Sequence, residues 1–250
     1  MPKLSSPPPP VLENMQASEL VEQYQKIWDK YSTTPINGPT KVEDTPLLNR
    51  GFEFQFDAEI NNPDVLFIGI NPSFQPDRPQ VRQAYAKPKN GPGYFRPFYK
   101  IEEDLKASYQ REITWTQLDL LVLRETQQPY IENHLLKAKR GQDFILEQLA
   151  VANEIITALK PKVIVVSNTL ARELMSGNSK QLVDGREVGV WMDYKYEFDQ
   201  TLGTEKMVQA GALNGTPVFF TAMLSGQKSI DRGTFQRLVW HIDAVLGKGE

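Results

Sequence analysis

Four short runs of apolar residues are the strongest pattern along the chain. They occupy Val65–Ile70, Trp115–Leu123, Val163–Val166 and Val218–Met223. Continuous apolar runs of this length, bounded by turn-forming residues, are typical of strands that are buried on both faces. The sequence therefore predicts four buried strands, of the kind found in parallel sheets.

Between these runs the apolar residues recur at helical spacing. The periodicity predicts helices over Leu12–Tyr31, Phe95–Leu105, Asp143–Leu159, Leu170–Met175 and Asp231–Leu246. The polar residues that precede Leu170 can cap the short fourth helix. Strands that alternate with helices predict an α/β protein. We expect three α/β/α layers around a central, mostly parallel four-stranded sheet.

The remaining segments predict loops, a tail and a β-rich region. Residues 1–11 include the run Pro7–Pro10 and predict an extended proline-rich tail, which leaves residues 12–250 as a single domain. Residues 71–93 are rich in proline and predict an irregular stretch, which in a compact domain is usually functional or disordered. Residues 177–217 alternate aromatic and polar positions, and Asn214–Gly215 is typical of a tight hairpin.

Composition narrows the functional classes. The net charge of −3 and the pI of about 5.6 give no bulk signature of nucleic-acid binding, although a local basic groove can lie on an acidic protein. The chain has no cysteine, and the spacing of His134 and His241 does not match a zinc motif, so we expect no metal and no other cofactor. The apolar runs are too short to cross a bilayer and the first residues lack a signal peptide, which predicts a cytoplasmic protein with no membrane partner.

Polar residues follow the predicted strands. Asn71 comes directly after the first strand, Asp119 lies in the second, Ser167 and Asn168 follow the third, and Ser225 follows the last. Ligands bind outside the carboxyl ends of the strands in open parallel sheets. We therefore expect these groups to converge at one edge of the sheet and to line a small-ligand cleft.

The residues Gly69–Ser73, GINPS, closely match GINPG, the first motif of the mismatch-specific uracil and thymine glycosylases. Further segments are similar, in order, to that family's aromatic loop, second strand, third strand with its helix, and closing motif: YFRPFYKIEEDL, TWTQLDLLVLRET, PKVIVVSNTLARELM and TPVFFTAMLSG. Over most of residues 63–246 the chain thus resembles the uracil-DNA glycosylase superfamily.

The resemblance implies a hydrolase of base-excision DNA repair. Such an enzyme flips a damaged or mismatched base out of DNA and cleaves its N-glycosidic bond with water. Asn71 matches the motif asparagine and would position the attacking water. The partner would be DNA that contains a damaged or mismatched base.

The resemblance also implies a set of binding residues. Base contacts would come from the motif loop, where Phe74 offers a stacking face; the loop residues are Gly69, Ile70, Pro72, Ser73 and Phe74. Hydrogen bonds to flanking phosphates would come from Ser167, Asn168 and Ser225.

The chain departs from the family pattern at three places. Ser73 stands where the motif has glycine, and the closing segment AMLSG has no histidine. Asp119 stands about where the base-reading asparagine belongs, and an ionised carboxylate only accepts hydrogen bonds. Asp119 would therefore prefer a base edge that presents donors, or would itself be the general base. An alternative follows: a nucleobase- or nucleic-acid-binding module of the same fold, with weak catalysis or none.

Overall fold

The computed structural model describes residues 16–32, 46–57, 60–78, 80–87, 93–176, 181–183, 186–188, 191–208, 211–224 and 229–249. The proline-rich tail at residues 1–11 and the candidate residue Ser225 lie outside these ranges.

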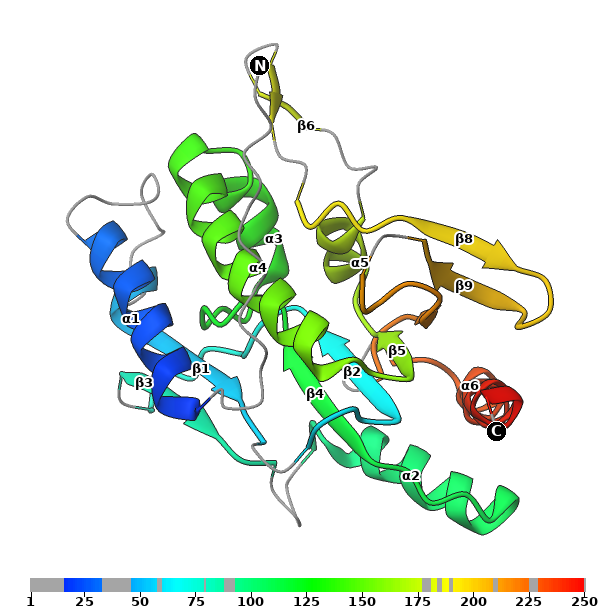
Figure 1. Ribbon diagram of the computed structural model, residues 1–250. Helices are drawn as coiled ribbons and strands as arrows, with labels where there is room; N and C mark the ends of the chain where they lie inside the picture. Colours follow the sequence, from blue (N-terminus) through cyan, green and yellow to red (C-terminus); the bar gives the residue numbers. More distant parts are fainter. Residues whose placement is uncertain are drawn as a thin grey trace.

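The centre of the molecule is a six-stranded sheet (Figure 1). Its strands, in spatial order, are β4 (Trp115–Asp119), β2 (Val65–Gly69), β5 (Val163–Val166), β10 (Pro217–Phe220), β9 (Thr204–Met207) and β8 (Tyr196–Asp199). The first four are parallel to one another, β9 is antiparallel to β10, and β8 is antiparallel to β9. The protein is thus an α/β protein with a mostly parallel mixed sheet.

The predicted four-stranded sheet corresponds to the parallel part alone. The two further strands come from residues 177–217, whose alternating pattern predicted β-structure but not its place in the sheet. The reason is that the β8–β9 hairpin joins the sheet through β10, which lies later in the chain, so the pairing is not visible in the local pattern.

Helices cover both faces of the sheet, which explains the continuous apolar runs. On one face, Leu66 and Ile68 belong to an apolar cluster with α1 (Ala17–Ser32), α4 (Lys139–Leu159) and α5 (Thr169–Met175). On the other face, Val65 and Phe67 pack with α2 (Arg96–Tyr109) and α6 (Arg232–Leu246). Alternate residues of β2 therefore face opposite layers.

Several short elements complete the described chain. They are a 3₁₀ turn (Leu47–Arg50), the one-turn helix α3 (Gln128–Tyr130) with a π-helical turn after it (Ile131–Leu135), the antiparallel pair β6 (Gln181–Val183) and β7 (Arg186–Val188), and a final 3₁₀ turn (Gly247–Gly249).

A second, two-stranded parallel sheet lies beside β4. It consists of β1 (Gly51–Gln55) and β3 (Val81–Tyr85). The Glu53 N–H donates to the carbonyl of Val122, and the Gln55 side chain donates to the hydroxyl of Thr116. β3 falls within the stretch predicted to be irregular, so part of that stretch is ordered by pairing with β1.

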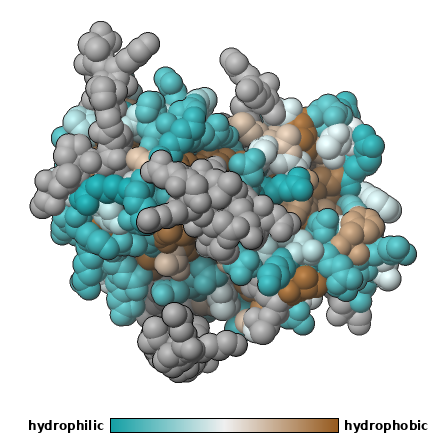
Figure 2. All heavy atoms as spheres, turned by 90° about the horizontal axis from the view of Figure 1, so that it is seen from above, coloured by the Kyte–Doolittle hydropathy of each residue, from teal (hydrophilic) through white to brown (hydrophobic). Residues whose placement is uncertain are grey.

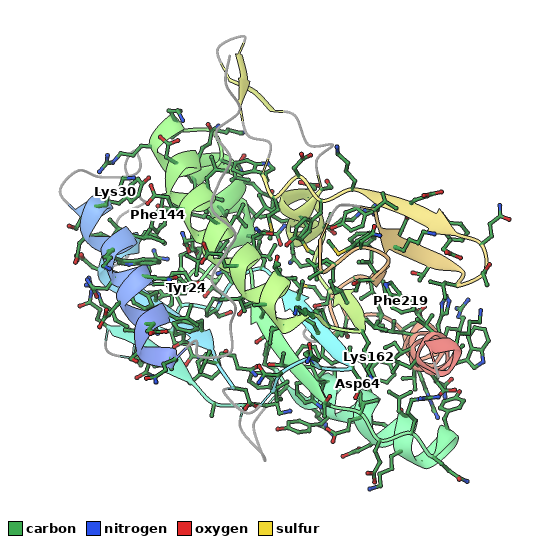
Figure 3. The ribbon with its side chains drawn as sticks, in the orientation of Figure 1. Tyr24, Lys30, Asp64, Phe144, Lys162 and Phe219 are labelled. Carbon is green, nitrogen blue, oxygen red and sulfur yellow. The ribbon has the colours of Figure 1, made fainter. Side chains whose placement is uncertain are left out.

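Helix α1 lies alongside α4 and packs against β1. Figure 3 shows Tyr24 and Lys30 on α1, with Phe144 of α4 beside them. The ring of Tyr24 lies 5.0 Å from that of Phe54, and Trp28 packs edge-on against Phe144 at 5.0 Å. Lys30 forms an ion pair with Glu147 of α4. Aromatic packing of this kind fixes the two-stranded sheet between α1 and the edge of the main sheet.

No helix in the described part of the chain is long and apolar enough to cross a membrane. Figure 2 shows the face seen from above, where hydrophilic side chains predominate and hydrophobic residues reach the surface in separate patches.

Candidate functional site

The parallel strands place their carboxyl ends at one edge of the sheet. Asp64 and Lys162 form an ion pair of 2.8 Å just before β2 and β5, and this pair marks the opposite, amino-terminal edge (Figure 3). At the carboxyl edge, Gly69 is in register with Asp119. The backbone thus brings the first-motif loop and the end of β4 to the same edge, as the sequence predicted.

Asn71 connects the loops that follow β2 and β4. Its side-chain amide nitrogen lies 2.8 Å from the carbonyl oxygen of Pro72, 3.3 Å from that of Leu123 and 2.6 Å from that of Glu125. Three acceptors around the amide nitrogen fix the orientation of the side chain, because the amide oxygen would be repelled there. The Asn71 Oδ1 atom has no hydrogen-bond donor among the described residues and is available to a ligand or water.

The rest of the first-motif loop is held by the β4 loop. The Pro72 carbonyl accepts from the Glu125 N–H, and the Phe74 carbonyl accepts from the Thr126 hydroxyl at 2.8 Å. Pro72 is buried, whereas Ser73 is exposed. The loop is therefore tied down along its length, with Ser73 facing outward.

Phe74 is half-buried and its ring contacts two arginines. The guanidinium carbons of Arg50 and Arg124 lie 4.5 Å and 5.5 Å from the ring centroid. Arg50 also forms a buried ion pair of 2.7 Å with Glu125. The cations already occupy positions over the ring, so Phe74 would need part of this arrangement to open before a base could stack on it.

Asp119 is buried at the end of β4, with 4% of its surface exposed. Gln117 Nε2 donates to Asp119 Oδ1 at 2.8 Å, and the Tyr94 hydroxyl hydrogen-bonds to the same carboxyl group. Burial raises the pKa of Asp119 to about 7; Glu53 acts in the same direction, and the two hydrogen bonds act against it. A carboxyl group with this pKa can accept or release a proton near neutral pH.

Gly69 lies directly beneath this carboxyl group. A Cβ atom at Gly69 would lie 2.2 Å from Asp119 Oδ1 and 2.9 Å from the Tyr94 hydroxyl. The carbonyls of Gly69 and Ile70 accept from Leu120 and Leu121. The backbone surface that the resemblance assigns to a base edge is thus covered by Asp119 and Tyr94, and glycine is the residue that allows this close approach.

Tyr94 and Tyr85 extend the polar cluster around Asp119. Burial, followed by the charge of Asp119, raises the pKa of both phenols, so both stay neutral near pH 7. Tyr94 is 40% exposed, although its hydroxyl hydrogen-bonds to the buried Asp119. Tyr94 therefore connects the buried acid to the surface.

The residues assigned to phosphates have structural partners. Ser167 is buried and its hydroxyl donates to the Ile68 carbonyl at 3.2 Å. Asn168 caps α5, since its Oδ1 accepts from the Ala171 N–H at 3.0 Å, and its Nδ2 donates to Gln128 at 3.0 Å. Both lie at the carboxyl edge, but their donors point into the protein. Their assignment to phosphates stays a prediction.

Two arginines of the segment that follows the first motif are engaged in ion pairs. Arg78 pairs with Glu53 at 3.9 Å and Arg82 pairs with Asp29 at 3.8 Å. Within the described ranges, no three His, Asp or Glu side chains are grouped so that they could hold a metal ion.

Sequence reasoning missed Tyr94 and Gln117 as members of the site. Tyr94 directly precedes the predicted helix Phe95–Leu105; Phe95 and Phe98 of that helix are buried, whereas Tyr94 is 40% exposed. For Gln117 the sequence contained a usable signal. It lies two residues before Asp119 in a predicted strand, and residues two apart in a strand lie on the same face.

No protein-family model matches the chain, and the curated proteins and solved structures compared with it gave no match either. The glycosylase resemblance therefore rests on the sequence motifs alone and stays a prediction.

Proposed function

We propose that the protein is a DNA glycosylase-like hydrolase of the uracil-DNA glycosylase fold, acting on a damaged or mismatched base. The observation that carries the proposal is Asn71, whose amide nitrogen is fixed by three carbonyls, while Oδ1 has no hydrogen-bond donor among the described residues. A fixed amide oxygen at the carboxyl edge of a parallel sheet suits the positioning of a water molecule.

The chemistry is a substitution at C1′ of the sugar. The water oxygen forms a bond to C1′, the N-glycosidic bond breaks, and its electron pair leaves with the base. Asn71 Oδ1 accepts a hydrogen bond from the water and orients it. Asp119, with a pKa near 7, is the group at this edge suited to take the water's proton.

The proposal is tested by base release from a panel of lesion-containing duplexes under single-turnover conditions. Wild-type protein is expected to release at least one base, and Asn71→Ala to lower the rate by about 10²-fold or more. No release and no binding across the panel would contradict the proposal.

Asn71→Ala also removes a connection between two loops, so a matched control is needed. Thr126→Val removes the hydrogen bond from Thr126 to Phe74, which joins the same two loops, and leaves Asn71 Oδ1 in place. This variant is expected to release base at nearly the wild-type rate. An equal loss in both variants would assign the effect to loop anchoring and not to water.

A second candidate is a nucleobase- or nucleic-acid-binding module that does not cleave. It is favoured by the closure of Asp119 and Tyr94 over Gly69, because this closure keeps a base edge away from the backbone there and so opposes cleavage, whereas nucleic acid can bind elsewhere on the surface. Tight binding of a lesion duplex without base release, at enzyme excess and long incubation, would select this alternative.

A further inference from the structure

A groove of about 950 Å³ runs between α2 and α6, and no residue of the first motif lines it. Its volume lies in the range of ligand-binding clefts. The α2 side is lined from Arg96 to Tyr109, which is the whole length of this 14-residue helix. At 1.5 Å per residue, the groove extends for about 20 Å along α2.

The charge of the groove is opposite to that of the whole protein. Arg96, Lys100 and Arg232 line it, and Asp104 is the one acidic side chain among its lining residues. Lys100 pairs with Asp104, whereas Arg96 and Arg232 are exposed and have no ion-pair partner within the described ranges. The groove thus presents uncompensated positive charge on a chain whose net charge is −3.

The positive charges gather at one end. Arg96 and Arg232 are the first residues of α2 and α6, and both helices begin near the carboxyl edge of the sheet, because α2 follows Tyr94 at Asp119 and α6 follows β10. Aromatic side chains lie along the groove: half-buried Phe235 is one turn after Arg232 on α6, and Tyr109, which is 37% exposed, is the last residue of α2. The groove therefore combines cations at one end with rings along its length.

We propose that this groove binds a single-stranded segment of nucleic acid, with phosphates on Arg96 and Arg232 and bases against Tyr109 and Phe235. Basic grooves with interspersed aromatic rings are the usual form of such sites. Consecutive phosphates of one strand are about 3.4 Å apart along a B-form axis, so the groove is long enough for several nucleotides. An acidic peptide would use the arginines but would have no need of the aromatic rings.

The inference rests on the proposed function only in taking nucleic acid as the partner. It adds the surface that holds the strand next to the candidate site, and it applies equally to the binding-module alternative.

The test is fluorescence anisotropy with a labelled oligothymidine strand that contains no lesion, measured at several salt concentrations. Arg96→Gln/Arg232→Gln is expected to weaken binding at least tenfold at low salt. It should also reduce the slope of log affinity against log salt by about 1.4, because two phosphate contacts are lost. Lys106→Gln/Arg237→Gln removes two charges from the same helices outside the groove and is expected to change neither value.

Competition identifies the occupant. Unlabelled oligothymidine should displace the probe, whereas polyglutamate and inorganic phosphate at equal charge concentration should not. Equal displacement by polyglutamate would overturn the proposal in favour of an acidic protein partner, and equal displacement by phosphate would reduce the groove to a simple anion site. Equal losses in the groove and control variants would also overturn it.

The outcome is separable from that of the proposed function. Suppose that the wild-type protein releases a base and that Arg96→Gln/Arg232→Gln still binds the strand normally. The proposed groove would then be rejected, and the proposed hydrolase activity would stand. Groove-dependent binding without base release would reject the hydrolase and keep the groove.

Discussion

Gly69 is the residue at which the first-motif strand and the buried acid meet. Since a Cβ atom there would lie 2.2 Å from Asp119 Oδ1, Gly69→Ala must displace the carboxyl group or the backbone. We expect the variant to lose about 1 to 3 kcal/mol of unfolding free energy, measured by urea denaturation.

The cause of that loss can be checked with a double-mutant cycle. In an Asp119→Ala background the obstructing carboxyl group is absent, so adding Gly69→Ala should cost much less than in wild type. If the two losses simply add, the destabilisation at Gly69 has another origin and the close approach to Asp119 is not its cause.

For single residues, the sequence predicted where the candidate site lies better than it predicted the contacts of the site's side chains. The position of Asn71 after a buried strand and of Asp119 within another placed both at the carboxyl edge, because parallel strands end together. The three carbonyls around Asn71 and the Tyr94–Asp119 hydrogen bond could not be predicted, since they depend on how the β2 and β4 loops fold against each other.

At the scale of elements, α1 and β1 dock through aromatic rings, and one hydroxyl in this contact has no hydrogen-bond partner among the described residues. The Tyr24 hydroxyl is buried, with no hydrogen bond to any described residue. Tyr24→Phe should therefore raise the unfolding free energy by about 1 kcal/mol, because an unsatisfied polar group is removed from the core.

Tyr31 on the same helix provides the matched control. Its hydroxyl donates to Glu147 at 2.7 Å, so Tyr31→Phe should lower stability in the same denaturation experiment. A loss in both variants would mean that the Tyr24 hydroxyl has a favourable partner in solution.

The elements differ in how far local pattern determines them. The strand predicted at Val163–Val166 is confirmed with the same bounds, since four β-branched residues buried on both faces leave little ambiguity. β1 and β3 were missed because they pair with each other although β2 of the main sheet lies between them in the sequence, and because β3 carries mostly polar residues of intermediate exposure. These two strands form through contacts between residues far apart in the sequence, which the local pattern of residues does not show.

For the whole molecule, Asp119 predicts how stability depends on pH. The unfolded chain releases this proton near the ordinary pKa of 3.8, whereas the folded protein holds it up to about pH 7. Between these values the folded state binds more protons than the unfolded state, so the stability contribution falls as pH rises and levels off above pH 7. The buried acid thus disfavours the folded state at neutral and alkaline pH.

Asp119→Asn removes this titration while Oδ1 can still accept from Gln117. The stability gain of the variant over wild type should grow by on the order of 2 kcal/mol between pH 5 and pH 8, measured by urea denaturation at each pH. A gain that does not change with pH would contradict the raised pKa.

Glu53 faces Asp119 and also raises its pKa, so Glu53→Gln should move the wild-type pH dependence to lower pH. Tyr85 and Tyr94 stay neutral throughout this range. The pH dependence of stability should therefore have a midpoint near pH 7 that disappears in Asp119→Asn and shifts in Glu53→Gln. Such a result would assign the titration to Asp119.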